Sequence, residues 1–115
     1  MDELNVKDLP ERFQIKIAND LEYLTSRDIP DLVEICLFGS VARGDYKWNS
    51  DIDIAIVTEK PLTDRSLRGE IVDVLDEDLN GVSSDVVFRV KDNNQSLSKI
   101  FDELYERDKK VLWKK

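Results

Sequence analysis

Three apolar runs of strand length, separated by segments with helical spacing, limit what this chain can fold into. The runs cover residues 32–38, 51–57 and 85–90. Before the first run, apolar side chains recur every three or four positions and predict an amphipathic helix over about residues 9–27. A second helical pattern lies between the last two runs. The alternation predicts an α/β (α+β) domain in which helices flank a small mixed sheet of three to five strands.

The helix boundaries can be predicted from capping residues. Asp8 and Glu11 resemble a capping box at the start of the first helix. Thr63 is expected to cap the second helix, and Asn80-Gly81 to end it in a left-handed turn. A last helix is expected from Ser96 to about residue 107, followed by a short strand at 111–113. The side chains expected to face inward from this helix are Leu97, Ile100, Phe101 and Leu104.

Composition excludes several classes of protein. The 115 residues suit one domain, taken as 1–115 with a core of about 30–113, and contain no histidine, which removes Ser-His catalysis and imidazole-bound zinc. With 17 basic and 25 acidic residues the net charge is -8, so no nucleic-acid partner is expected. No apolar run approaches a membrane span, and Met1-Asp2-Glu3-Leu4 does not resemble a signal peptide. A single cysteine, Cys36, is expected to be a buried inert thiol, and a cytoplasmic location is predicted.

A candidate phosphate site follows the first apolar run. Gly39-Ser40 ends this run and is expected to open a short helix, where free backbone N–H groups favour anions. Arg43 lies on the same helical face and could contact the same anion. When Gly39-Ser40 is considered alone, an ordinary turn with a capping serine is the favoured interpretation.

Three carboxylates form a candidate metal site. Asp51 and Asp53 lie two residues apart on a predicted strand and therefore project from the same face. A divalent cation would relieve their mutual repulsion, and hard oxygen ligands favour Mg²⁺. If the next strand is adjacent, Asp85 joins them, and three acids could hold two ions. Solvated acids at exposed strand ends are the alternative interpretation.

The spacing of these motifs resembles a known family. Gly39-Ser40, ten intervening residues and Asp51-Ile52-Asp53 are similar to the G-S-x10-D-x-D signature of the nucleotidyltransferase superfamily related to DNA polymerase beta. Arg43 and its neighbours at 42–45, together with Ser50, also resemble the small members called minimal nucleotidyltransferases. The resemblance covers about residues 30–113 and implies a palm-like fold.

The resemblance implies a role for each residue of the motifs. Gly39 and Ser40 would hold the β- and γ-phosphates of a nucleoside triphosphate, with Arg43 and Ser50 as further nucleotide contacts. Asp51 and Asp53 would bind two Mg²⁺ ions. Asp85 would bind the catalytic ion and help to deprotonate the acceptor hydroxyl, which attacks the α-phosphorus. Such chemistry depends on positioning and charge neutralisation and needs no histidine.

The resemblance also implies a partner. Proteins of this type are antitoxins paired with HEPN-domain RNase toxins, so the expected function is transfer of AMP from ATP to a tyrosine hydroxyl of such a toxin, as a type VII-like antitoxin. Two alternatives remain: a non-catalytic module that neutralises its toxin by contact, and a nucleotidyltransferase acting on a small molecule. The exposed loop residue Trp48 could stack on a base or contact a partner.

Overall fold

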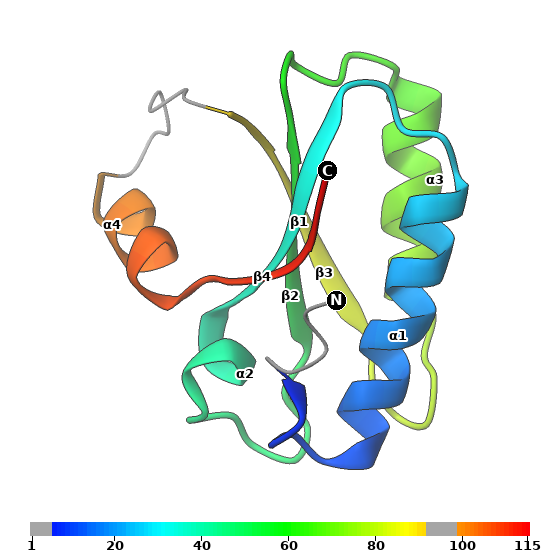
Figure 1. The fold of residues 1–115 in the computed structure, drawn as a ribbon. Coiled ribbons are helices and arrows are strands. Elements are labelled where there is room, and N and C mark those ends of the chain that lie inside the picture. Colours follow the sequence, from blue (N-terminus) through cyan, green and yellow to red (C-terminus); the bar gives the residue numbers. More distant parts are fainter. Residues whose placement is uncertain (1–5, 92–98) are drawn as a thin grey trace.

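A four-stranded mixed sheet forms the centre of the fold (Figure 1). The computed structural model describes residues 6–91 and 99–115. The strands are β1 (Leu32–Phe38), β2 (Ile52–Thr58), β3 (Ser84–Val90) and β4 (Lys110–Lys114), and their order in the sheet is β3-β2-β1-β4. β2 and β3 run parallel, whereas β1 is antiparallel to both β2 and β4. The predicted α+β class with a small mixed sheet is confirmed.

Helices cover both faces of this sheet. α1 (Glu11–Ser26) and α3 (Arg65–Asp76) lie side by side on one face, and α4 (Lys99–Asp108) lies on the other (Figure 1). The short α2 (Gly39–Arg43) follows directly from the end of β1. No helix within residues 6–91 and 99–115 is both long and apolar enough to cross a membrane.

Successive side chains of a strand point to opposite faces of the sheet, and each face of this sheet carries its own hydrophobic cluster. Toward α1 and α3, alternate residues of β1 and β2 are fully buried in the larger cluster: Ile35, Leu37, Ile52, Ile54 and Ile56. Toward α4, a smaller cluster is built on Cys36, Ala55 and Tyr105. Cys36 is fully buried, as predicted, and burial raises the pKa of its thiol to about 11, which disfavours the reactive thiolate.

Two predicted helix N-caps are wrong. The N-cap of α1 is Pro10, and no side chain caps this end, because Asp8 lies two residues upstream of the cap. The Pro10 carbonyl instead accepts from the backbone N–H groups of Phe13 and Gln14, at 3.0 and 3.1 Å. At α3 the cap is Asp64 rather than Thr63.

The cap of α3 and its end follow from local backbone geometry. The Asp64 carboxylate accepts from the Leu67 N–H at 3.0 Å, as an N-cap side chain does. The helix ends at Asp76, before the predicted stop at Asn80-Gly81. That pair does adopt left-handed backbone angles, but it forms the tight turn that closes the Leu79–Val82 bridge.

The inward face of α4 also differs from the prediction. Ile100 and Leu104 are 69% and 41% exposed, whereas Tyr105 is only 3% exposed. Phe101 and Tyr105 pack edge-on against Phe38, with ring centroids 5.9 and 5.5 Å apart, so aromatic packing sets the rotation of the helix. Ser96 and Leu97, for which a helix start and a buried position were predicted, lie outside the described residues.

Candidate active site

The end of β1 and the beginnings of β2 and β3 meet at one end of the sheet. Asp53 of β2 lies opposite Asp85 of the parallel strand β3. On its other side, Asp53 lies opposite Phe38 of the antiparallel strand β1. Asp51 immediately precedes β2, and Gly39 immediately follows β1. The strand register therefore gathers the acidic side chains beside the Gly39-Ser40 turn, on the face of the sheet that carries α4.

Gly39 allows an unusually close approach between this turn and a carboxylate. Its φ of +77° lies in the left-handed region, which disfavours any side chain. A Cβ at this position would lie 2.1 Å from Asp53 Oδ2 and 3.0 Å from Asp53 Cγ. Both the backbone angle and the space therefore require glycine here, and they bring the backbone of the turn against Asp53.

The acidic cluster carries negative charge that is poorly compensated. Burial, followed by the charges of Asp85 and Asp51, raises the pKa of Asp53 to about 6, and the charge of Arg43 opposes this rise. The pKa of Asp85 is also raised, first by burial and then by Asp51 and Asp76. Desolvation and like charges both disfavour ionised carboxylates, so this cluster would gain from a bound cation.

The chemistry of the cluster suits Mg²⁺. Asp51, Asp53 and Asp85 offer hard oxygen donors, and burial followed by like charge raises the pKa of Asp53 and Asp85, a combination that a divalent ion would relieve. Within residues 6–91 and 99–115, however, no three His, Cys, Asp or Glu side chains already stand as metal ligands.

The two other residues predicted to contact nucleotide form local interactions. Arg43 Nε pairs with Asp45 Oδ2 at 3.2 Å, and its Nη1 pairs with Asp108 Oδ2 at 3.4 Å, which joins α2 to α4. Ser50 Oγ accepts from the Lys47 N–H at 2.7 Å and closes the turn before β2. These contacts explain both residues structurally, and their contact with a nucleotide stays a prediction.

The loop before β2 presents an exposed aromatic side chain. Trp48 is 79% exposed, while Arg12 donates a hydrogen bond to its backbone carbonyl. Nearby, the Tyr46 ring packs edge-on against Phe13 at 5.2 Å between centroids. The loop is thus held by its backbone and by Tyr46, and the Trp48 indole stays free to contact a base or a partner.

A buried polar network, which was not predicted from the sequence, connects the start of β3 to α1 and α3. Lys16 Nζ donates to Asp20 Oδ1 at 2.6 Å and to the Leu75 carbonyl at 2.9 Å, and Ser84 Oγ donates to Asp20 Oδ2 at 2.5 Å. Lys16, Asp20 and Ser84 are each buried. Burial raises the pKa of Asp20, although Lys16 and Ser84 lower it. The network joins α1 and α3 to the residue that precedes Asp85.

Comparison with known protein families shows which family the chain belongs to. The family model described as a nucleotidyltransferase domain matches residues 16–110. This chain belongs to the nucleotidyltransferase domain family. It is therefore a nucleotidyltransferase, and the matched range includes every predicted site residue. No curated protein matches the chain.

Solved structures of nucleotidyltransferases share the fold. A toxin–antitoxin complex with AMP-PNP is 33% identical, with a TM-score of 0.59 over 84% of this chain and 73% of its own. A nucleotidyltransferase from Sulfolobus solfataricus is 25% identical, with a TM-score of 0.57 over 95% and 92%. A Shewanella oneidensis complex of a tri-AMPylated HEPN toxin with its MNT antitoxin is 27% identical, with a TM-score of 0.54 over 87% and 73%. The chain is thus structurally similar to nucleotidyltransferases of toxin–antitoxin systems.

The raised pKa of Asp53 predicts a pH effect on the stability of the metal-free protein. The pKa of Asp53 is about 6 in the folded protein, whereas an ordinary aspartate has a pKa of 3.8. Between about pH 4 and about pH 6 the folded protein therefore keeps a proton on Asp53 that the unfolded chain has released. The free energy of unfolding should therefore fall, by about 2 kcal/mol from this residue, as pH rises from about 4 to about 6. Asp53→Asn should remove this fall in urea titrations, whereas the exposed Asp73→Asn should retain it. Equal pH profiles for Asp53→Asn and the unchanged protein would contradict the prediction.

Proposed function

We propose that this nucleotidyltransferase transfers AMP from ATP to a hydroxyl group of a partner HEPN-type toxin, with Mg²⁺ as the metal. The observation that carries the proposal is the Gly39-Ser40 turn lying directly against Asp53, which in turn lies opposite Asp85. The similarity to a complex containing AMP-PNP and to a complex containing an AMPylated toxin supports the donor and the acceptor class.

The residues of the turn and the cluster have distinct roles in this proposal. The backbone N–H groups of Gly39 and Ser40 bind the β- and γ-phosphates, because the first turn of a helix leaves its N–H groups without partners. Asp51 and Asp53 would hold two Mg²⁺ ions, and Asp85 would complete the ligands of the ion nearer the acceptor. When bound, Mg²⁺ neutralises phosphate charge and stabilises the charge that develops during transfer.

The transfer itself is a displacement at the α-phosphorus. The acceptor oxygen forms a bond to the α-phosphorus while the bond to the oxygen that bridges the α- and β-phosphorus atoms breaks, and pyrophosphate leaves. Asp85, the more exposed of the two paired carboxylates, takes the proton of the acceptor hydroxyl. The hydroxyl is proposed to be that of a tyrosine. Because the chain carries a net charge of -8, a basic RNA-cleaving partner would also be attracted to it.

Labelled ATP tests this function directly. With Mg²⁺ and the partner toxin, label in the α-phosphate should appear on the partner, whereas label in the γ-phosphate should not. Asp51→Asn combined with Asp53→Asn should lower the transfer rate at least 1000-fold, because the metal ligands are lost. Asp73→Asn, on the outer side of α3, serves as the matched control and should keep the rate.

Three results would contradict the proposal in different ways. Unchanged transfer by the double variant would exclude the acidic cluster as the site. Neutralisation of the toxin by the double variant, without any labelling, would indicate a binding module that acts by contact. Labelling of a small molecule in place of the partner would indicate a different acceptor class.

A further inference from the structure

A polar pocket lies on the same face of the sheet as the candidate active site, at the opposite end of the strands. Its volume is about 280 Å³, and its lining comes from all four strands and from α4. Val57 and Arg89 of this pocket each follow an acid of the site by four residues, on β2 and β3 respectively. Four residues of strand span about 13 Å, so the pocket lies beyond the acidic cluster and does not overlap it.

Basic side chains dominate the lining of this pocket. They are Arg89, Lys91, Lys109 and Lys114, against the two acids Glu34 and Glu106. The excess of positive charge is notable in a chain whose net charge is -8. A local positive surface on an acidic protein selects for an anionic ligand at that place.

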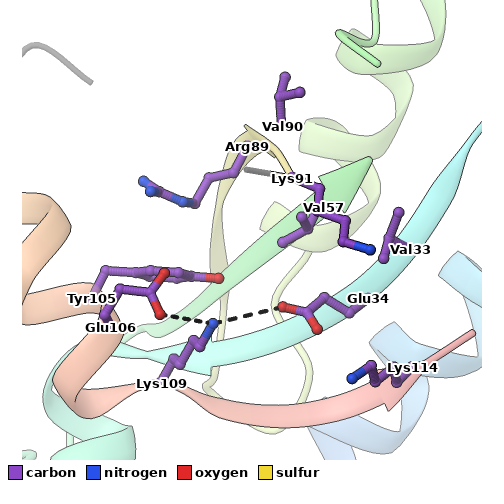
Figure 2. Close-up of a pocket in the computed structure, with 10 residues that line it drawn as sticks. All are labelled: Val33, Glu34, Val57, Arg89, Val90, Lys91, Tyr105, Glu106, Lys109 and Lys114. Atoms are coloured by element: carbon purple, nitrogen blue, oxygen red, sulfur yellow. Dashed lines mark ion pairs between the residues drawn. The ribbon is translucent and has the colours of Figure 1, made fainter. Parts of the chain in front are cut away.

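Two of the four cations of the pocket are already engaged: Arg89 pairs with Asp102 at 3.0 Å, and Lys109 is shared between the two acids of the lining. Lys109 Nζ lies 3.0 Å from Glu106 Oε1 and 3.8 Å from Glu34 Oε1, and Figure 2 shows it between them. Lys91 and Lys114 have no ion pair with any residue that the structure describes, and Figure 2 shows their ammonium groups on either side of Glu34. These two cations are therefore available to a ligand.

A buried hydroxyl forms the floor of the pocket. Tyr105 is 3% exposed, and Figure 2 shows its oxygen directed into the pocket. Within residues 6–91 and 99–115 this oxygen has no hydrogen-bond partner, and the Cys36 thiol beside it is at best a weak one. Burial raises the pKa of Tyr105, so its hydroxyl keeps the proton that it can donate. This buried donor, directed into the pocket, can serve an acceptor atom of a ligand that enters it.

We propose that this pocket binds the phosphate group of a nucleotide, with Lys91 and Lys114 as its cationic contacts and the Tyr105 hydroxyl as a donor below it. Lysine ammonium groups bind phosphate as point charges, and the volume accommodates a phosphate with its ribose. The phosphate comes either from free AMP or from an AMP group already attached to the acceptor. This site is additional to the proposed transfer site and does not require that transfer occurs.

Nuclear magnetic resonance can locate the binding directly. AMP is titrated into the full chain in EDTA, where transfer cannot take place, while backbone amide shifts are followed. We expect saturable shifts at Val57, Arg89 and Lys114, and at least tenfold weaker binding for Lys91→Gln combined with Lys114→Gln. The matched control, Lys7→Gln combined with Arg65→Gln, removes two exposed cations, of which Arg65 begins α3 on the other face of the sheet, and should bind AMP as the unchanged protein does.

Two comparisons complete the test. Tighter binding of a tyrosine-AMP peptide than of AMP assigns the pocket to an AMP group on the acceptor, and equal or weaker binding assigns it to the free nucleotide. Shifts confined to the Gly39-Ser40 turn would overturn the proposal, as would equal AMP binding by the two double variants. Because no transfer is measured, these failures are distinguishable from a failure of the proposed activity.

Discussion

Gly39→Ala is expected to lower the rate of nucleotidyl transfer at least 100-fold. The added Cβ would lie 2.1 Å from Asp53 Oδ2, so either the carboxylate or the turn must move. A displacement of about 1 Å in a reacting arrangement can cost a factor of about 100 in rate. The left-handed φ of +77° adds a cost in folding stability of about 1–2 kcal/mol. Transfer kinetics and urea unfolding measure the two effects separately.

Gly81→Ala separates the crowding of the site from backbone strain. Gly81 has a φ of +81°, but a Cβ there would meet nothing within 4 Å. This control should lose a similar amount of folding stability and retain its transfer rate. A Gly39→Ala protein that transfers nucleotide as fast as Gly81→Ala would show that the close approach of the turn to Asp53 has no part in the reaction.

Lys16→Met is expected to lower the free energy of unfolding by about 3–5 kcal/mol, because it leaves the buried Asp20 carboxylate without its cation. The same substitution also removes the donor to the Leu75 carbonyl. Since Asp20 holds Ser84 next to Asp85, the transfer rate of the folded fraction should fall as well. Chemical unfolding at pH 7 measures the stability change.

Arg27→Met provides the matched control for Lys16→Met. Arg27 pairs with Glu70 on the surface, where both side chains are about 40% exposed, and exposed pairs contribute little to stability. Combining Lys16→Met with Asp20→Asn should recover part of the lost free energy of unfolding, because the unpaired buried carboxylate of Asp20 is then also removed. A Lys16→Met protein as stable as Arg27→Met would contradict the role assigned to the buried network.

The strands were predictable because their apolar residues are contiguous and their ends carry distinctive residues. The run at 32–38 coincides with β1, and the acidic start of the run at 51–57 marks the beginning of β2. The helix caps were less predictable, since neighbouring residues such as Thr63 and Asp64 have similar capping chemistry and only backbone geometry chooses between them. The rotation of α4 depends on aromatic packing against β1, which its own spacing does not reveal.

The residues of the candidate site stay a prediction from the sequence, whereas the close approach of Gly39 to Asp53 could not be predicted from it. The spacing of Gly39-Ser40 and Asp51-Ile52-Asp53, together with the family resemblance, selected the turn and these two acids, and the position of Asp85 at the start of the next predicted strand added the third. The approach of Gly39 to Asp53 depends on the register of β1 against β2, which no local pattern encodes. The network of Lys16, Asp20 and Ser84 brings together three distant segments, although the i,i+4 spacing of Lys16 and Asp20 on the apolar side of α1 was a usable signal.

A crystal structure of the protein with Mg²⁺ and a non-hydrolysable ATP analogue would test the central claim most directly. We predict that the triphosphate lies against the Gly39-Ser40 turn, with Mg²⁺ bound by Asp51 and Asp53 and with Asp85 completing the ligands of the ion nearer the acceptor. A triphosphate bound away from this turn, or Asp85 beyond coordination distance of any metal, would contradict the account.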